Sequence, residues 1–267
     1  MAITGADVPG MAGLAGHNEL TRVRRFEAAG FRAWPAASVH YDGTWAIRLT
    51  PGHPAKRLNS VNPLDPADSG DVAGRLARAA ERFREADVPL VLRLSPLAAP
   101  AISSYLDAQG WQRFGNSHVM VAHLSAFDFA PVLDQLPVRD VQRFVAAHEN
   151  IRDGRGAPVA QVISRIEPEA GMFVHEVDGV AAATAICVQD ADLAGLFEVA
   201  TAHQYRRSGH ARHTVLTALK WARLRGARTA WLQVEADNMA ALDLYTSLGF
   251  ATLYSYHYRC PPQDGLA

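Results

Sequence analysis

The chain has 267 residues, a formal net charge of -1 and 49% hydrophobic residues. This length permits one large domain or two small ones. A charge balance near zero argues against nucleic acid or an anionic membrane as a partner, and no run of 18 apolar residues predicts a membrane span. The two cysteines, Cys187 and Cys260, match neither a disulfide framework nor a zinc motif. They fit a reducing cytoplasm, which is the location we predict.

Hydrophobic periodicity and turn residues predict the elements of the first half. A leader precedes a short amphipathic helix over 20–29 that ends at Gly30. Strands are predicted over 44–50, 56–64, 90–94 and 116–124, and helices over 71–86 and 96–109. A Phe- and Pro-containing linker follows over 125–136.

The pattern is clearer in the second half. Asp178-Gly179 is a strong hairpin turn, and Gly226 and Gly249 each follow a predicted helix. Helices are predicted over 138–148, 159–166, 209–225 and 238–248, and strands over 172–177, 180–188, 193–201, 229–236 and 250–259. The two halves share this order of elements, and Gly110-Trp111 echoes Gly249-Phe250. We interpret the order as a diverged internal duplication.

The segment 201–211 predicts a phosphate site, because a strand runs through a turn into a helix there. The first N–H groups of a helix have no internal partner and attract anions. Gly209 and Ala211 would let a phosphate approach the backbone, and Arg206 and Arg207 would add two cations. A pyrophosphate is the natural ligand. The alternative is an ordinary helix start that carries a surface arginine pair.

A second group of residues lies in the helix predicted over 238–248. Asn238, Ala241 and Tyr245 are spaced three and four apart, so they fall on one face. An amide, a small residue and a phenol make a stripe that is more polar than a core stripe. The alternative is that Asn238 only caps the helix and Tyr245 packs in the core.

Together these patterns resemble the GNAT acetyltransferase superfamily. The resemblance covers about 60 residues, from Phe197 to Tyr256, in matching order and spacing. The residues that carry it are Arg206-x-x-Gly209-x-Ala211, the helix ending in Gly226, the strand 232–235 and Asn238-x-x-Ala241-x-x-x-Tyr245-x-x-x-Gly249-Phe250. Arg207 and Ala211 stand where that superfamily often has glycine.

The resemblance implies an α/β fold with a mixed sheet, in which a splayed strand pair holds acetyl-CoA. It places the pyrophosphate on the backbone of 207–211 (Arg207, Ser208, Gly209, His210 and Ala211), with Arg206 beside it. It places the backbone of Val199 and Thr201 along the pantetheine arm and acetyl group, with Asn238 bonded to the arm. Tyr245 would be the general acid that protonates the leaving thiolate.

An amine acceptor must also lose a proton, and a carboxylate can take it. Glu198 is the first candidate because it lies in the strand that leads to the phosphate loop. The alternatives for Glu198 are an exposed strand position or a salt bridge, and Glu235 is the second candidate for the base. His210 and His213 are three apart, but no suitably spaced carboxylate or cysteine completes a metal site, so we predict none. Tyr254, Tyr256 and Tyr258 alternate and favour a packed stripe over a pocket wall.

The first half has the order of elements without the signatures, so it resembles a degenerate repeat, as in tandem GNAT proteins such as mycothiol synthases. Lys56, Arg57, Asn59 and Ser60 are interpreted as a solvated polar edge rather than an anion site. The predicted organisation is a flexible leader (1–18), a degenerate GNAT-like domain (19–125), a linker (126–136), a catalytic GNAT domain (137–260) and a tail (261–267).

The predicted function is acetyl transfer from acetyl-CoA to a primary amine, by direct transfer and without a metal. A small-molecule acceptor is favoured, with a protein N-terminus or lysine left open. The alternatives are a cofactor-binding sensor without turnover, against which Tyr245 and Glu198 argue, and an acyl group other than acetyl. Because two repeats would mimic a dimer within one chain, a monomer is our hypothesis for the oligomeric state.

Overall fold

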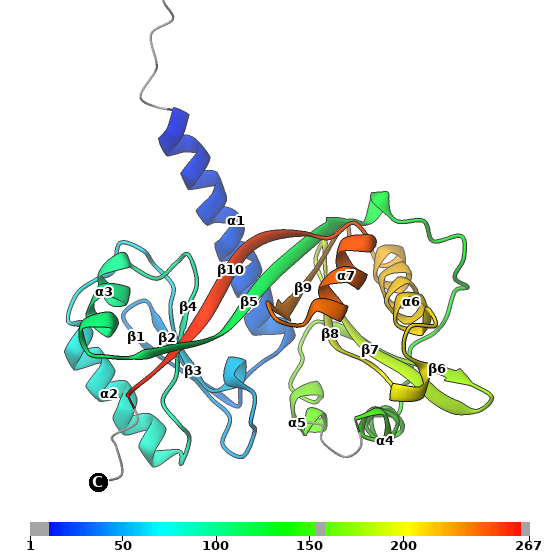
Figure 1. Cartoon of the computed structure of the whole chain (residues 1–267), viewed down its shortest axis with the longest axis horizontal. Helices are drawn as coiled ribbons and strands as arrows, with labels where there is room; N and C mark the ends of the chain where they lie inside the picture. Colours follow the sequence, from blue (N-terminus) through cyan, green and yellow to red (C-terminus); the bar gives the residue numbers. More distant parts are fainter. Residues whose placement is uncertain (1–10, 153–157, 263–267) are drawn as a thin grey trace, which may run out of the picture.

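A computed structural model of the chain describes residues 11–152 and 158–262, in which ten strands form one mixed sheet (Figure 1). The strands are β1 (Ser38–Asp42), β2 (Trp45–Leu49), β3 (Ser60–Pro63), β4 (Leu92–Leu94), β5 (Gln112–His123), β6 (Glu169–Val177), β7 (Val180–Asp190), β8 (Leu193–Thr201), β9 (Thr229–Glu235) and β10 (Ala251–Cys260). The helices are α1 (Met11–Ala33), α2 (Val72–Glu85), α3 (Pro100–Ala108), α4 (Val141–Ile151), α5 (Val159–Ile163), α6 (His210–Leu224) and α7 (Met239–Ser247). The predicted fold class is confirmed.

The sheet order is β1-β2-β3-β4-β10-β5-β9-β8-β7-β6. Strand β10, the last of the second half, lies between β4 and β5 of the first half. Strand β5, the last of the first half, lies between β10 and β9 of the second half. Figure 1 shows β5 and β10 crossing the middle of the molecule as two long neighbouring strands. Backbone hydrogen bonds thus join the two predicted domains, whose boundaries stay a prediction.

The order within each half supports the duplication. In each half a parallel strand pair, β3 with β4 or β8 with β9, brackets a helix, and a second helix and a long strand follow. Gly110 and Gly249 both adopt positive φ, +70° and +91°, where α3 and α7 end. A helix end in the left-handed region favours glycine, which explains the echo between the two segments.

Three clusters of buried side chains cover the two faces of the sheet. Helix α1 packs with α4 and α5 on one face and reaches strands of both halves. Helices α6 and α7 pack on the other face of the C-terminal half, and α2 and α3 pack on the N-terminal half. The three tyrosines of β10 are buried, as the packed-stripe interpretation predicts. Tyr254 also donates a hydrogen bond of 2.6 Å to Glu27 of α1.

One local prediction is wrong. Helix α1 begins at Met11 and continues past Gly30 to Ala33, so residues 11–18 of the predicted leader are helical, while residues 1–10 lie outside the described residues. A Cβ at Gly30 would lie 3.4 Å from the Gln233 side chain, an ordinary contact distance, so the helix packs on β9 at Gly30 and is not interrupted there. The segment 126–136 is packed on the second half, since Phe127, Phe129 and Val132 are buried in a cluster with residues of α6 and with Phe250, and its role as a linker stays a prediction.

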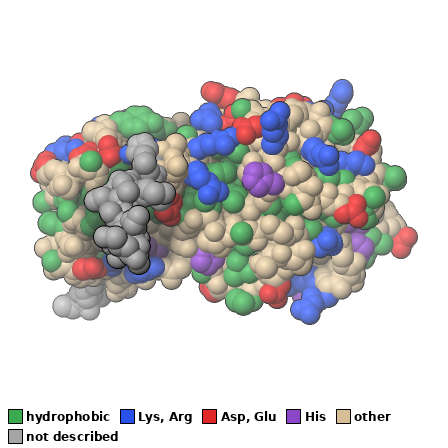
Figure 2. All heavy atoms as spheres, turned by 90° about the horizontal axis from the view of Figure 1, so that it is seen from above, with side chains coloured by type: hydrophobic (Ala, Val, Ile, Leu, Met, Phe, Trp, Pro, Cys, Tyr) green, Lys and Arg blue, Asp and Glu red, His purple; other side chains and the backbone are tan. Residues whose placement is uncertain are grey.

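The surface mixes charges of both signs. On the face shown in Figure 2, Lys and Arg side chains stand among Asp and Glu side chains, in keeping with the net charge of -1. Within the parts of the chain that the structure describes, every helix is too short or too polar to cross a bilayer.

Candidate active site

Strands β8 and β9 separate partway along their length. They pair in parallel from Leu193–Thr229 to Leu196–Leu232, and no pairing continues toward Thr201. On its other side β8 carries a bulge against β7, because Ile186 pairs with Phe197 whereas Thr184 pairs with Ala200. Glu198 lies in this bulge with a positive φ of 48°. The bulge and the separation together open the sheet at the position where Glu198 turns.

A cavity of about 880 Å³ lies beside this opening. Such a volume is in the range of cofactor and small-ligand sites. Ten of the twelve predicted site residues line it: Val199, Thr201, Arg206, Arg207, Gly209, His210, Ala211, Asn238, Ala241 and Tyr245. Ser208 and Glu198 do not line it. Residues of β8, α6 and α7, far apart in sequence, are thus brought to one cavity.

The loop before α6 has the geometry of an anion site. Gly209 is the N-cap of α6 with φ +83°, and no side chain caps the helix. A Cβ built on Gly209 would meet nothing within 4 Å, so the helix end is open. Arg207 also has a positive φ, +62°. Uncapped N–H groups at the helix start, next to Arg206 and Arg207, fit the negative charge of a diphosphate.

The conformation of Arg207 explains why glycine is frequent at this position and leads to a stability prediction. We expect Arg207→Gly to raise the free energy of unfolding by about 0.5–1 kcal/mol, because the left-handed conformation strains a residue with a Cβ. The matched control is Arg206→Gly, since Arg206 has an ordinary φ of -68°. That control should be destabilising by a similar amount. Urea unfolding of both variants tests this, and a loss of stability in Arg207→Gly would contradict it.

Helix α7 carries the amide and the phenol. The Asn238 side chain caps α7 by accepting a hydrogen bond of 3.2 Å from the Ala241 N–H, as the capping alternative predicts, and it also lines the cavity. Tyr245 is 7% exposed and packs edge-on against Phe250, so it is also a core residue. Burial raises the pKa of Tyr245 above its ordinary value, so this hydroxyl is protonated at neutral pH.

Glu198 lies between side chains of both halves. One carboxylate oxygen is 3.3 Å from Nε2 of His148 in α4, and the other is 3.9 Å from Arg57 of the first half. Burial pushes the pKa of Glu198 upward, but contact with His148 and the charge of Arg57 outweigh it, so the pKa is lowered overall. The carboxylate is therefore ionised at neutral pH. The salt-bridge alternative for Glu198 and a role as a base both fit this arrangement.

The sequence analysis did not identify His148, and it placed Arg57 on a solvated edge rather than beside Glu198. His148 is fully buried, and its Nδ1 is 2.9 Å from the Thr184 hydroxyl. Its contact with Glu198 depends on the packing of α4 against β7 and β8, which the sequence does not reveal.

The predicted solvated edge is wrong for Asn59 and Ser60, which are 4% and 0% exposed. Asn59 bonds the backbone of the segment around Thr50. Glu235, the second candidate base, is 59% exposed and 3.5 Å from Lys56.

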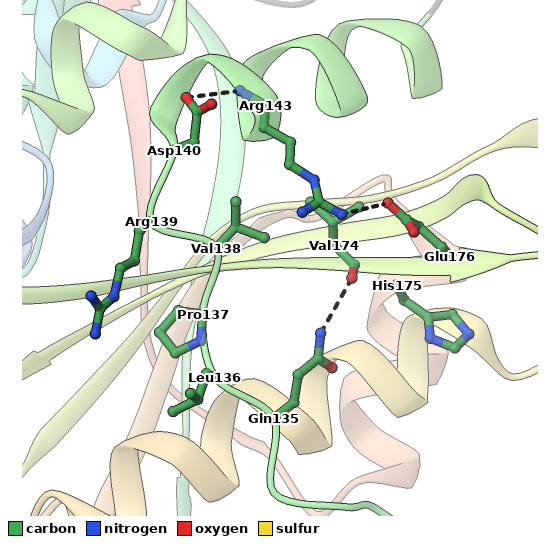
Figure 3. Close-up of a pocket in the computed structure, with 10 residues that line it drawn as sticks. All are labelled: Gln135, Leu136, Pro137, Val138, Arg139, Asp140, Arg143, Val174, His175 and Glu176. Carbon is green, nitrogen blue, oxygen red and sulfur yellow. Dashed lines mark hydrogen bonds and ion pairs between the residues drawn. The ribbon is translucent and has the colours of Figure 1, made fainter.

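A second cavity, of about 570 Å³, lies between the segment 135–140 and β6 (Figure 3). Gln135 donates a 3.4 Å hydrogen bond to the carbonyl of Val174, and Arg143 pairs with Glu176 at 3.2 Å. His175 lines this cavity and contacts His210 at the start of α6, with 3.0 Å between Nε2 and Nδ1. The two cavities are therefore neighbours.

The histidines pack against one another at this boundary. The His175 ring centroid is 4.6 Å from that of His213 and 5.1 Å from that of His210, with tilted planes. Burial lowers the pKa of His175, with a smaller contribution from its neighbours His213 and His210.

Among residues 11–152 and 158–262, no three His, Cys, Asp or Glu side chains are arranged to hold a metal ion.

The fold and the separated strands above the cavity define a class: the protein is an acyltransferase, an N-acetyltransferase of the GNAT superfamily. The chain belongs to the family described as "Probable histone acetyltransferase Rv0428c C-terminal", whose model matches residues 21–259. The matched residues include both halves of the chain.

Known relatives agree with this class. The "Uncharacterized N-acetyltransferase YobR" of Bacillus subtilis is 23% identical over 248 residues, 89% of this chain and 98% of that protein. The "[Ribosomal protein bS18]-alanine N-acetyltransferase" of Escherichia coli is 40% identical over 90 residues, 33% of this chain and 60% of that protein. The structure of a GCN5-related N-acetyltransferase from Kribbella flavida superposes with a TM-score of 0.67 at 21% identity, covering 91% of this chain and 96% of that one.

Proposed function

We propose that the cavity beside β8 binds acetyl-CoA and that the protein transfers the acetyl group directly to a primary amine. The observation that carries this proposal is the convergence of β8, α6 and α7 on one cavity of about 880 Å³ with an open helix end in its wall. The loop from Arg206 to Ala211 would hold the diphosphate by backbone N–H groups and two guanidinium groups. Asn238, Val199 and Thr201 would hold the pantetheine arm.

Bound acetyl-CoA would supply an activated acyl carbon, and the protein would move the protons. Glu198 would accept the proton that the acceptor amine loses, directly or through a water, because its carboxylate is ionised at neutral pH. Tyr245 would donate a proton to the departing sulfur, because its hydroxyl stays protonated and lines the same cavity. His148 and Arg57 would hold Glu198 in position and favour its charged form.

The start of α2, the helix of the first half that corresponds to α6, differs from the start of α6. At the start of α2 the Asp71 side chain caps the helix by accepting a 3.2 Å hydrogen bond from Gly74 N–H. Asp68 accepts 2.6 Å and 2.8 Å hydrogen bonds from Thr44 and Arg75 in the same region. Carboxylates of the protein itself thus occupy the end of α2, and they would repel a diphosphate.

We therefore expect acetyl-CoA to bind at one site per chain. Calorimetric titration of the purified protein with acetyl-CoA measures this stoichiometry directly. Two sites would show that the first half is not degenerate, and absence of binding would refute the proposed cofactor.

The double substitution of Arg206 and Arg207 by Gln should weaken binding of acetyl-CoA about tenfold or more, since two charge-assisted contacts are lost. The exposed arginine Arg24, replaced by Gln, is the matched control.

For the acceptor we favour a small molecule. A protein α-amine is the second candidate, because the ribosomal-protein alanine N-acetyltransferase of E. coli shares 40% identity over 90 residues with this chain. Assays with short peptides that carry a free N-terminus, beside small amines at the same concentration, separate the two candidates. A marked preference for the peptides would overturn the small-molecule proposal.

A further inference from the structure

A small buried cavity lies where α1 and the first half meet the separated strands. Its wall contains three guanidinium groups, from Arg48, Arg57 and Arg93, and one carboxylate, from Glu27. Phe197 and Gln233 contribute from β8 and β9. These side chains carry three positive charges and one negative charge, and such an excess of one sign is unusual at a buried site.

The single carboxylate is already engaged. Arg93 forms a bidentate ion pair with Glu27, in which one of the two hydrogen bonds is 2.9 Å long. Both side chains are at most 4% exposed. The Tyr254 hydroxyl donates a further 2.6 Å bond to the same carboxylate. Glu27 is therefore neutralised by Arg93 and leaves the charge of Arg48 uncompensated.

Arg48 is the unusual residue of the group. It is 3% exposed, and its guanidinium donates to the carbonyl groups of Trp34 and Arg57 while lying 4.4 Å from the ring of Phe31. Within the described residues it pairs with no carboxylate, and its buried Nε has no hydrogen-bond partner. Burial, and then the like charge of Arg93, lowers the pKa of Arg48 to about 9. A buried cation without a counter-ion is costly, and an anionic ligand would relieve that cost.

Arg57 connects this cavity to the proposed site of transfer. It lines the cavity, lies over the rings of Trp34 and Phe197, and is 3.9 Å from Glu198. Arg57 thus lies between this cavity and Glu198, so an anion bound to Arg57 would be close to an amine beside Glu198. The volume of the cavity is about 10 Å³, close to the volume that holds one water molecule. It therefore suits one oxygen of a carboxylate better than a larger phosphate. Arg57 is 30% exposed and can shift to admit the group.

We propose that this arginine-lined cavity binds the carboxylate of the acceptor, so that the acceptor is a small amino acid-like molecule with amine and carboxylate on one skeleton. This inference rests on the proposed function, since the amine must face Glu198. Planar guanidinium groups suit a carboxylate because they offer two parallel donors.

Paired acceptors test the proposal. Release of CoA thiol is measured with L-alanine against L-alaninamide, β-alanine against β-alaninamide, and L-lysine against 1,5-diaminopentane. We expect kcat/KM to be about tenfold to a hundredfold higher for the acid of each pair. Arg57→Gln should lower the ratio of kcat/KM for the acid to kcat/KM for its carboxylate-free partner about tenfold in each pair, because the weaker support of Glu198 affects both members while the lost carboxylate contact affects only the acid. The control Arg24→Gln, an exposed arginine of α1, should leave both unchanged. Equal use of both members, or preference for the member without a carboxylate, would overturn the proposal.

A second variant gives a readout that does not depend on turnover. Gln233→Glu would place a carboxylate in the cavity wall while keeping the oxygen that accepts a 2.8 Å bond from Tyr256. We expect it to compensate Arg48, raise the melting temperature at pH 7 and abolish any preference for acids. Gln112→Glu, on an exposed position of β5, is the control. A lower melting temperature in Gln233→Glu than in this control would refute the uncompensated charge.

The two proposals fail in different ways. If acetyl-CoA binds and only the amines without a carboxylate are acetylated, the carboxylate proposal is wrong and the proposed function stands. If acetyl-CoA does not bind in the calorimeter, the proposed function is wrong, whatever the melting temperature of Gln233→Glu. If acetyl-CoA binds and none of the six amines is acetylated, the carboxylate proposal is wrong, because the three acids carry an amine and a carboxylate on one skeleton and are still refused.

Discussion

We expect Tyr245→Phe to lower kcat about a hundredfold and to leave the dissociation constant of acetyl-CoA nearly unchanged. The substitution removes only the hydroxyl that would protonate the leaving sulfur, and general acid catalysis contributes about 10²–10⁴-fold. The ring keeps its buried place against Phe250, so folding should be preserved. Steady-state kinetics and calorimetry with the same preparation separate the two effects.

A tyrosine outside the site provides the control for this variant. Tyr105 lies in α3 of the first half and is also partly buried. Tyr105→Phe should leave kcat unchanged. If Tyr245→Phe also kept full activity, the phenol would not be the acid, and another group or a water would have to protonate the sulfur.

The second large effect is expected at Glu198. Glu198→Gln should lower kcat/KM for the amine about a hundredfold to a thousandfold at neutral pH, because the amide cannot accept the amine proton. Acetyl-CoA affinity should be retained, since Glu198 does not line the cavity proposed for the cofactor. The control is Glu169→Gln, whose carboxylate pairs with Arg225 at 2.7 Å away from the site. Raising the pH should restore part of the activity of Glu198→Gln, because a larger fraction of the free amine is then unprotonated.

The pH profile tests the surroundings of Glu198. Its pKa is lowered in the folded protein, since His148 and Arg57 outweigh the effect of burial. The acid limb of kcat/KM should therefore lie below the ordinary range for a glutamate. His148→Gln removes one of the lowering partners, so we expect the limb to move to higher pH. An unchanged limb with a lower kcat would mean that His148 acts only through packing against Phe144.

The same shift affects stability. A carboxylate whose pKa is lower in the folded than in the unfolded chain adds stability above its unfolded pKa, and this contribution is lost as the pH falls through the folded pKa. The difference in unfolding free energy between the wild type and Glu198→Gln should therefore shrink in acid. Urea unfolding at pH 7 and at a series of acidic pH values measures this difference.

Local patterns along the chain were sufficient to predict much of the C-terminal half. The turn at Asp178-Gly179, the glycines after α6 and α7, and the alternation of β8 and β9 all depend on residues close in sequence. The residues predicted for the cofactor are likewise local groups, 199–211 and 238–245, and the structure brings both to one cavity. Helical spacing and the chemistry of a helix N-terminus are properties of single elements, so they can be read without a fold.

The long-range arrangement could not be predicted in this way. Strand β10 pairs with both β4 and β5, because its buried tyrosines fill the seam between the halves and Tyr254 reaches Glu27 of α1. The contact of Glu198 with His148 requires the bulge in β8 and the packing of α4, which lie about 50 residues apart in the chain. Gly30 fails as a helix stop because tertiary packing against β9 outweighs its low helix propensity.

The sequence by itself therefore determined the class of protein, the order of elements and the residues proposed for acetyl-CoA, because each depends on local spacing and backbone chemistry. Only the tertiary structure decided what surrounds Glu198 and where the uncompensated charge of Arg48 lies. Both depend on burial and on charges from distant segments, namely α1, β2, the segment that carries Arg57, and α4. Electrostatic energy is set by distance and solvent exposure, and neither is encoded by the spacing of residues along the chain.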